Sequence, residues 1–242
     1  MLPTVGSIFI FGFIIYLINR LFYANFGGSG RAVCYATGFI GTPVHELSHA
    51  LMCLVFFHRI TEIRLFQISD DGTLGYVNHS YNPRNVYQRI GNFFIGVAPI
   101  LCISAILYAA VYLLLPTFAS EVAELGATGS VGAIWSSVKA FFVGVTSWQW
   151  WVFVIIGMLL ALHMNLSGAD IKGAWSGLIV LLVVVAIVDV VLGLVVVSAL
   201  DNFTAFMLTA AGYMICFFIV ALIISLLALI ISFIFRPILA RR

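Results

Sequence analysis

Long apolar stretches separated by two polar segments dominate the chain. A helix needs about 20 apolar residues to cross the hydrocarbon core of a bilayer. Of the 242 residues, 63% are hydrophobic and 8% are charged, whereas a soluble domain carries about 25% charged residues. The pattern predicts an all-α integral membrane protein with about six transmembrane helices, near Val5–Phe22, Ala32–Phe57, Ile90–Leu115, Trp148–Leu166, Gly173–Leu200 and Phe203–Phe235.

The first polar segment, residues 58–89, predicts a β-hairpin within a single membrane-embedded domain that covers residues 1–242. β-Branched and aromatic residues with partial alternation occupy Ile60–Phe66, and Thr73–His79 has the pattern of a return strand. The Asp-Asp-Gly sequence at 70–72 between them is typical of a turn. We therefore expect a hairpin directly after the second apolar stretch.

The second polar segment, residues 116–147, is predicted to have a structural role only. Residues 130–142 fit an amphipathic helix that lies on the outer membrane surface. Its apolar side would present Trp135, Val138 and Phe142 to lipid. We expect this segment to support the bundle and to take no part in a functional site.

The positions of the basic residues predict the orientation in the membrane. Lys and Arg are enriched in cytoplasmic loops. With both termini in the cytoplasm, most of the 11 Lys and Arg residues fall inside. We therefore expect a multi-pass protein of the plasma (inner) membrane with both termini cytoplasmic. The inside residues are Arg59, Arg64, Arg84, Arg89, Lys172, Arg236, Arg241 and Arg242.

The sequence His45-Glu46-Leu47-Ser48-His49, inside the second apolar stretch, carries the candidate chemistry. On a helix, two histidines at i and i+4 share one face and can bind one metal ion. Glu46 is placed beside them to take a proton from a metal-bound water. Ionisable side chains are costly in a bilayer and are usually functional there. We therefore predict a metal site with His45 and His49 as ligands and Glu46 as the catalytic base.

A third ligand must come from elsewhere, because catalytic zinc usually has three protein ligands. His163, Ser167 and Asp170 follow one another at i, i+4 and i+7 in a polar island at the far end of the fourth apolar stretch. We favour Asp170, since a carboxylate leaves the site less positive than a third histidine would, and His163 is the alternative. Asp189, a lone acid among valines, receives no role. The full set of candidates is His58, His79, Glu62, His163, Asp170 and Asp189.

Residues Gly41–Ala50 resemble the signature helix of the site-2 protease family of intramembrane zinc metalloproteases. Asn165 and Asp170 are similar, in position and order, to the second zinc-binding element of that family, an Asn…Pro…Asp-Gly pattern in a later membrane helix. Gly96-Val97-Ala98-Pro99 resembles its Gly-Pro element. The Asn-to-Asp spacing is shorter here, no Pro lies between, and Ile171 stands where the family has Gly. The chain therefore resembles a divergent member.

The resemblance implies a zinc-dependent metalloendopeptidase that cleaves transmembrane or membrane-associated protein substrates. Zn²⁺ would be held by His45, His49 and Asp170, and Asn165 would help to stabilise the oxyanion. The predicted hairpin would align the substrate as an added strand. The expected partners are such a protein substrate and the lipid bilayer, with no nucleic acid.

Two other functions stay open. The alternative is a metal-binding membrane transporter or a non-proteolytic pseudo-protease, which Asp189 and the shortened Asn165–Asp170 element favour. A third plan, similar to that of CAAX-processing proteases, would use a glutamate as the third ligand. The distal glutamates Glu121 and Glu124 face outward in the expected topology, so we rank this plan last.

Overall fold

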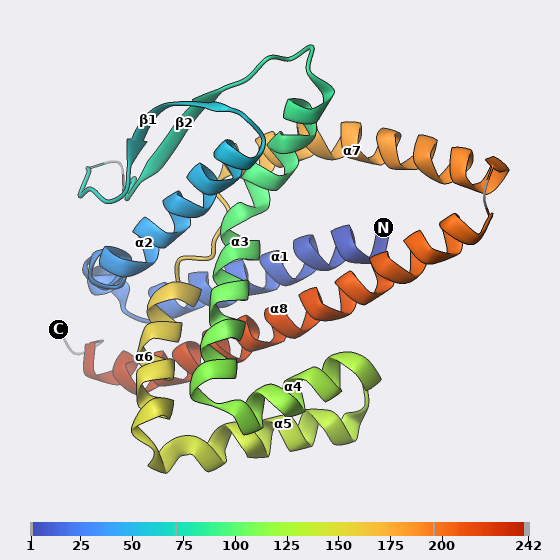
Figure 1. The fold of residues 1–242 in the computed structure, drawn as a ribbon. Helices are drawn as coiled ribbons and strands as arrows, with labels where there is room; N and C mark the ends of the chain where they lie inside the picture. The colour runs from blue at the N-terminus through green and yellow to red at the C-terminus, as the bar shows by residue number, and fades with distance from the viewer. Residues whose placement is uncertain (1, 71, 196, 240–242) are drawn as a thin grey trace.

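The computed structural model describes residues 2–70, 72–195 and 197–239. These residues are mostly helical and include a two-stranded antiparallel sheet, as the sequence predicts (Figure 1). The elements in chain order are α1 (Leu2–Ala24), η1 (Gly27–Ser29), α2 (Gly30–Val55), β1 (Arg59–Arg64), β2 (Tyr76–Ser80), α3 (Val86–Leu114), α4 (Pro116–Thr128), α5 (Val131–Val143), η2 (Gly144–Thr146), α6 (Trp148–Ala161), α7 (Gly168–Val195) and α8 (Val197–Leu239).

Four of the described helices are long and apolar enough to cross a membrane, which indicates a membrane protein. They are residues 5–24 of α1, 86–114 of α3, 168–194 of α7 and 201–236 of α8. Residues 131–146 and 148–161 add a fifth span only if this pair, bent by 113°, crosses as one unit. The prediction of six spans is therefore not confirmed. α2 does not qualify, because its polar residues lower its hydropathy.

The predicted fourth span, Trp148–Leu166, is wrong in its length, because α6 ends at Ala161. The side-chain amide of Asn165 donates a hydrogen bond to the carbonyl oxygen of Leu162, 3.3 Å away. Such local side-chain bonds compete with the helical pattern of backbone bonds. Residues 162–167 therefore form an irregular loop, and the next helix begins at Gly168.

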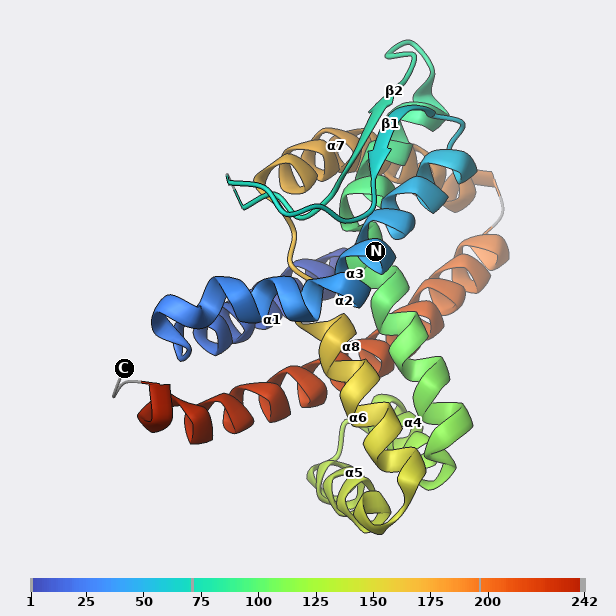
Figure 2. The same cartoon turned by 90° about the vertical axis from the view of Figure 1, so that its left-hand side faces the viewer.

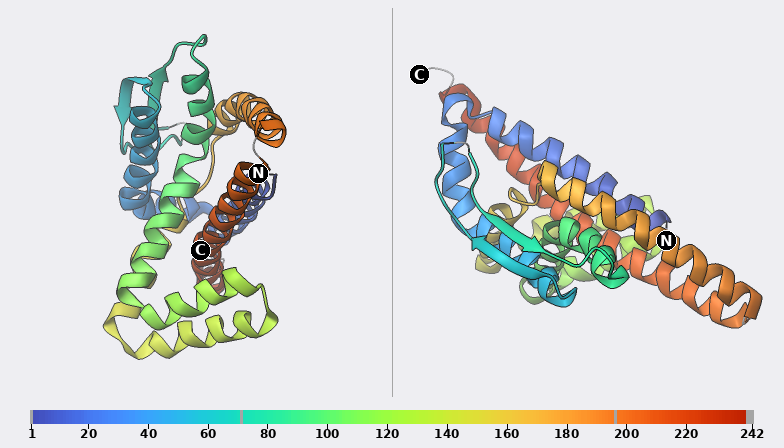
Figure 3. Two further views of the ribbon diagram at one scale, coloured as in Figure 1. Left: turned by 45° about the vertical axis from the view of Figure 1, so that its right-hand side comes forward. Right: turned by 90° about the horizontal axis from the view of Figure 1, so that it is seen from above.

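α3 is the central element of the bundle. It packs against α2, α6, α7 and α8, and α1 lies along α8 (Figure 2). Buried side chains of α3 such as Phe93, Val97 and Ile100 form the middle of the apolar core. α7 and α8 extend together away from the other helices (Figure 3). This arrangement places α7 against α3.

The hairpin predicted after the histidine-rich helix is confirmed. β1 and β2 pair antiparallel from Arg59 opposite Ser80 to Arg64 opposite Tyr76, with an irregularity between Ile60 and Glu62. The strands are shorter than predicted, because residues 65–70 and 72–75 lie outside them. The hairpin follows α2 directly, and both of its strands contact α2 (Figure 1).

The segment between α3 and α6 is more helical than predicted. α5 covers the expected amphipathic helix, with the Ser130 hydroxyl accepting a hydrogen bond from the backbone N–H of Ala133 at its start. α4 precedes it and was not expected. The two helices form an antiparallel pair at the end of the molecule opposite the hairpin (Figure 1).

Candidate metal centre

His45 and His49 lie on neighbouring turns of α2, and their Nε2 atoms point toward each other. The two Nε2 atoms are 3.2 Å apart. The helix continues through this region without a break, so the spacing of i and i+4 sets the pair locally. His49 and the intervening Glu46 are both buried. The predicted ligand pair therefore exists as a geometric unit within one helix.

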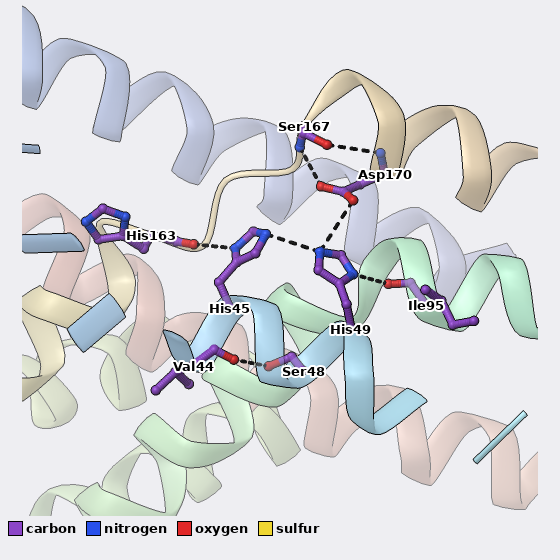
Figure 4. Close-up of polar contacts among 8 residues, drawn as sticks. All are labelled: Val44, His45, Ser48, His49, Ile95, His163, Ser167 and Asp170. Atoms are coloured by element: carbon purple, nitrogen blue, oxygen red, sulfur yellow. Dashed lines mark hydrogen bonds and ion pairs between the residues drawn. The ribbon is translucent and has the colours of Figure 1, made fainter. Parts of the chain in front are cut away.

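Asp170, in the first turn of α7, completes a group of three possible ligands. Its Oδ1 atom lies 3.4 Å from Nε2 of His49. One donor atom from each of His45, His49 and Asp170 lies within 4.8 Å of the others. These three residues can therefore hold one metal ion, and they come from two helices far apart in sequence (Figure 4).

Hydrogen bonds to backbone carbonyl oxygens determine which ring nitrogen of each histidine points toward the other two candidate ligands. Nδ1 of His45 donates to the carbonyl oxygen of His163, and Nδ1 of His49 donates to that of Ile95, both at 2.7 Å (Figure 4). A carbonyl oxygen only accepts, so each Nδ1 carries the proton and each neutral ring keeps its Nε2 lone pair. Metal-binding histidines are usually oriented in this way.

The protonation of both Nδ1 atoms indicates whether these residues fit a metal ion. With both Nδ1 atoms protonated, neither neutral ring has a proton left for the Nε2–Nε2 contact at 3.2 Å. Two lone pairs at that distance repel each other, and a shared cation removes the repulsion. A carboxylate oxygen of Asp170 adds a third donor atom on the same side. The donor set therefore fits a divalent cation with affinity for imidazole.

Asp170 is held by the start of its own helix. The backbone N–H of Ser167 donates to Oδ2 of Asp170 at 2.7 Å, and the Ser167 hydroxyl accepts from the N–H of Asp170 at 3.1 Å. These reciprocal bonds form a capping box with an aspartate. One carboxylate oxygen thus caps α7, which leaves the other for His49 (Figure 4).

α3 fixes α7 against the histidine pair. A side chain at Gly96 would meet the carbonyl oxygen of Asp170 and would come within 2.8 Å of Ala174. Only glycine allows the two helices to approach this closely. The neighbouring residue, Ile95, supplies the carbonyl that orients His49. One stretch of α3 therefore positions ligands from both α2 and α7.

Glu46 separates two cavities beside the ligands. The loop-side cavity has a volume of about 290 Å³ and extends to the loop after α6, and the hairpin-side cavity has about 230 Å³ and extends to β2. Both are lined by Glu46 and His45. The residue just before β2 lies close to the glutamate, since a Cβ atom at Gly75 would be 2.8 Å from its Cγ.

His163 does not bring its ring to the other ligands. Its Nε2 atom bonds with the hydroxyls of Thr37, at 3.0 Å, and Tyr23, at 3.3 Å. Its Nδ1 atom faces the hydroxyl of Thr42 at 3.4 Å. Figure 4 shows the ring turned away from His45. The geometry therefore favours Asp170 over His163 as the third ligand, as the sequence analysis did.

Asn165 lies in the loop before α7 and lines the loop-side cavity. Its side-chain oxygen accepts a hydrogen bond from Asn19 at 3.1 Å, and its side-chain nitrogen donates to the Leu162 carbonyl at 3.3 Å. The amide therefore ties the loop to α1 and closes a bond within the loop itself. Its expected contact with an oxyanion stays a prediction.

The remaining candidates lie outside the ligand group. Asp189 is exposed further along α7, and the carboxylate of Glu62, exposed on β1, accepts a hydrogen bond from the Tyr76 hydroxyl at 2.6 Å. Nδ1 of His58 lies 3.0 Å from Nδ1 of His79, which lines the hairpin-side cavity. Glu121 and Glu124 belong to α4, at the opposite end of the molecule from the hairpin (Figure 1).

Asn92 lines the hairpin-side cavity and was not among the residues predicted from the sequence. Its side chain is buried, at 6% exposure, within α3. In the sequence, Asn92 is visible only as a single amide side chain near the start of the apolar stretch Ile90–Leu115. That signal does not indicate which face of the helix would meet the histidines.

Comparisons of this chain with protein-family models, curated proteins and solved structures find no match. The interpretation of the site therefore depends on the positions of its own side chains. These positions support a metal-binding group of two histidines and one aspartate, with a buried glutamate beside it that is outside the group.

Proposed function

We propose that the protein is a zinc-dependent endopeptidase embedded in the membrane, which hydrolyses peptide bonds of membrane or membrane-proximal proteins. One observation carries this proposal: buried Glu46 adjoins the group of His45, His49 and Asp170 without belonging to it. A structural metal site needs ligands only. A hydrolytic site also needs a base next to the metal, and Glu46 is placed to be that base.

The ligand set is the reason to propose zinc. Two imidazole nitrogens and a carboxylate oxygen form a common set of three protein ligands in catalytic zinc sites, which keep one position open. A zinc ion there would polarise a carbonyl group and lower the pKa of a bound water toward about 7. His45, His49 and Asp170 would hold it, each fixed by a backbone partner.

Glu46 would do the proton transfers of the reaction. Its carboxylate accepts a proton from the attacking water and then delivers it to the nitrogen of the departing amine. Because Glu46 lines both cavities, it can reach a water molecule and a peptide group on either side. Asn165, in the loop-side cavity, is the proposed donor to the carbonyl oxygen as negative charge develops on it.

The hairpin would align the substrate. One edge of β2 pairs with β1, and residues Tyr76, Val77, Asn78 and His79 of the same strand line the hairpin-side cavity. An extended peptide can add to a free strand edge through main-chain hydrogen bonds. A peptide in this position would pass Glu46, where its scissile bond would be attacked. We place the site toward the cytoplasm, with both chain termini on that side, from the distribution of basic residues.

The substitution Glu46→Gln tests the proposal. Glutamine keeps the size of the side chain and cannot accept the proton, so we expect unchanged zinc content and cleavage reduced by about 10²-fold or more. The measurement is hydrolysis of fluorescein-labelled casein by detergent-solubilised protein, with zinc counted by plasma mass spectrometry. Glu121→Gln, in α4, is the matched control and should cleave like the parent.

Two outcomes would contradict the peptidase. Full activity of the Glu46→Gln protein would remove the base from the mechanism. A parent protein that binds zinc and cleaves nothing would favour the alternative, a metal-binding transporter or a pseudo-protease. That alternative uses the same three ligands but assigns no function to the buried carboxylate of Glu46.

A further inference from the structure

Asn92 is a buried polar side chain for which the protein supplies no partner. Its exposure is 6%, and its side-chain amide has no hydrogen bond to any residue that the structure describes. Most buried amides are paired, because an unpaired one loses its bonds to water and gains nothing in exchange. An amide kept at this place, in a helix otherwise rich in apolar residues, therefore points to a partner from outside the chain.

The amide of Asn92 is open to the hairpin-side cavity. The residue lines this cavity together with His45, His49 and Asp170, and with His79 of β2. Its polar atoms are not among the completely enclosed unpaired atoms of the described residues. A molecule bound beside the metal ligands can therefore reach it.

α3 holds Asn92 in a fixed place relative to the ligands. Ile95, three residues later, orients His49 through its carbonyl oxygen, and Gly96 packs against the backbone of Asp170. A Cβ atom at Gly177, also in α7, would lie 3.0 Å from the carbonyl carbon of Asn92. The backbone of this residue therefore packs closely against the helix that carries Asp170.

Asn165, the other amide near the site, differs in this respect. Its oxygen already accepts from Asn19, and one of its two N–H groups already donates to Leu162. Asn92 keeps both functions free, among the described residues. A side-chain amide has the same donor and acceptor groups as a peptide unit, so it can pair with a peptide backbone of any sequence.

We propose that Asn92 is a substrate-binding residue that pairs with the backbone of a polypeptide in the hairpin-side cavity. Its Nδ2 donates to a peptide carbonyl oxygen, and its Oδ1 accepts from a peptide N–H. This inference rests on the proposed function, since it takes the ligand beside the metal site to be a polypeptide. It adds to that function a contact from α3, in a cavity that β2 also lines.

Two zinc-binding probes of different length test the contact. Acetohydroxamate reaches only the metal, whereas succinyl hydroxamate linked to leucyl-phenylalaninamide also carries peptide groups into the cavity. Affinities are measured by titration calorimetry on zinc-loaded, detergent-solubilised protein. For Asn92→Leu and Asn92→Ser we expect about ten-fold weaker binding of the peptide probe, as for the loss of one or two hydrogen bonds, and unchanged binding of acetohydroxamate.

Asn25→Leu is the matched control. Asn25 donates to the Ser232 hydroxyl at 2.8 Å between α1 and α8, and it does not line the cavity. Its variant should bind both probes like the parent. Zinc content checks that each variant has kept the site, and the smaller Asn92→Ser replacement serves if the leucine variant does not fold.

Each other result overturns the inference. Unchanged affinity for the peptide probe in the zinc-loaded variants shows that Asn92 does not touch the backbone. An equal loss for both probes assigns Asn92 to the metal centre instead. A parent protein that binds acetohydroxamate and not the peptide probe excludes a polypeptide from the cavity. If the parent binds neither zinc nor acetohydroxamate, the proposed function itself fails, and the inference fails with it.

Discussion

The imidazole of His45 donates a hydrogen bond from Nδ1 to the backbone carbonyl oxygen of His163, 2.7 Å away. The residue that the sequence offered as an alternative ligand thus acts on the site through its main chain. Its ring serves a separate network with Tyr23 and two threonines. A backbone contact of this kind survives substitution of the side chain, which gives a clear test of the third ligand.

Replacing Asp170 and replacing His163 should have different effects on the metal. We expect Asp170→Ala to lose zinc, because it removes a ligand atom, and His163→Ala to keep it, because the carbonyl that orients His45 remains. His163→Ala should still destabilise the fold by about 1–3 kcal/mol, since it leaves the buried hydroxyl of Thr42 without its partner. Zinc content and thermal unfolding of both purified variants check the prediction.

A reversal of the two zinc results would make the His163 ring the ligand. Retention of zinc by both variants would instead mean that the two histidines of α2 bind the metal with a different third group. Asp189→Ala is the matched control for Asp170→Ala, because Asp189 is exposed on the same helix and lies outside the ligand group. It should keep the zinc content of the parent.

A side chain at Gly96 should separate α7 from α3. In Gly96→Ala the added methyl group meets the carbonyl oxygen of Asp170 and the side chain of Ala174. Overpacking of this kind costs about 1–3 kcal/mol. Displacement of Asp170 should also weaken zinc binding, about ten-fold or more, as happens when the supports of metal ligands are lost. Competition with a fluorescent zinc chelator measures the affinity.

Gly212→Ala is the control for this change. Gly212 lies in α8 with no heavy atom within 4 Å of an added Cβ atom. Its replacement should leave zinc affinity unchanged and raise stability slightly, by up to about 1 kcal/mol, because alanine favours a helix. Unchanged zinc affinity in Gly96→Ala would show that the α3–α7 contact does not position Asp170.

Acidification should loosen the hairpin. Nε2 of His58 donates to the carbonyl oxygen of Gln88 at 2.8 Å, and its Nδ1 faces Nδ1 of His79 at 3.0 Å. Burial lowers the pKa of both histidines from 6.5, and for His79 the neighbouring His58 and His49 add to the effect. The unfolded chain therefore binds more protons, so this contribution to stability is complete above pH 6.5 and decreases as the pH falls below it.

Hydrogen exchange of residues 59–80 checks the pH dependence. After correction for intrinsic exchange rates, protection should decrease between pH 7.5 and about 5.5, a window that includes the ordinary histidine pKa of about 6.5. His58→Phe, which can still stack on Tyr81 but cannot be protonated, should reduce the change. Protection that is equal at both pH values in the parent would rule out this titration.

The features that the sequence predicts correctly follow from local patterns of residues. The length of the apolar stretches requires helices, because a bilayer leaves backbone groups no other partners. The spacing of His45 and His49 sets their distance within one helix, and turn-forming residues at 70–72 with extended segments on each side predict the hairpin. None of these features depends on a distant part of the chain, so the sequence was sufficient for them.

The number of membrane-spanning helices could not be predicted from local patterns. Trp148–Leu166 is apolar enough for a continuous helix, but α6 ends at Ala161 and the following residues instead contact α1 and α2. Asn19 donates to the carbonyl oxygen of Ala161 at 2.8 Å, from a position 142 residues earlier in the chain. No local pattern contains that partner.

A helical membrane protein, a histidine pair on one helix face and a following hairpin could all be predicted from local sequence patterns. Helix packing was needed to show that Asp170 meets the pair, that carbonyls of His163 and Ile95 leave both Nε2 atoms unprotonated, and that Asn92 faces the same cavity. The two groups of features differ in the origin of their contacts. Helix and turn geometry follow from neighbouring residues, whereas ligand orientation and cavity shape follow from helix packing between segments far apart in the chain.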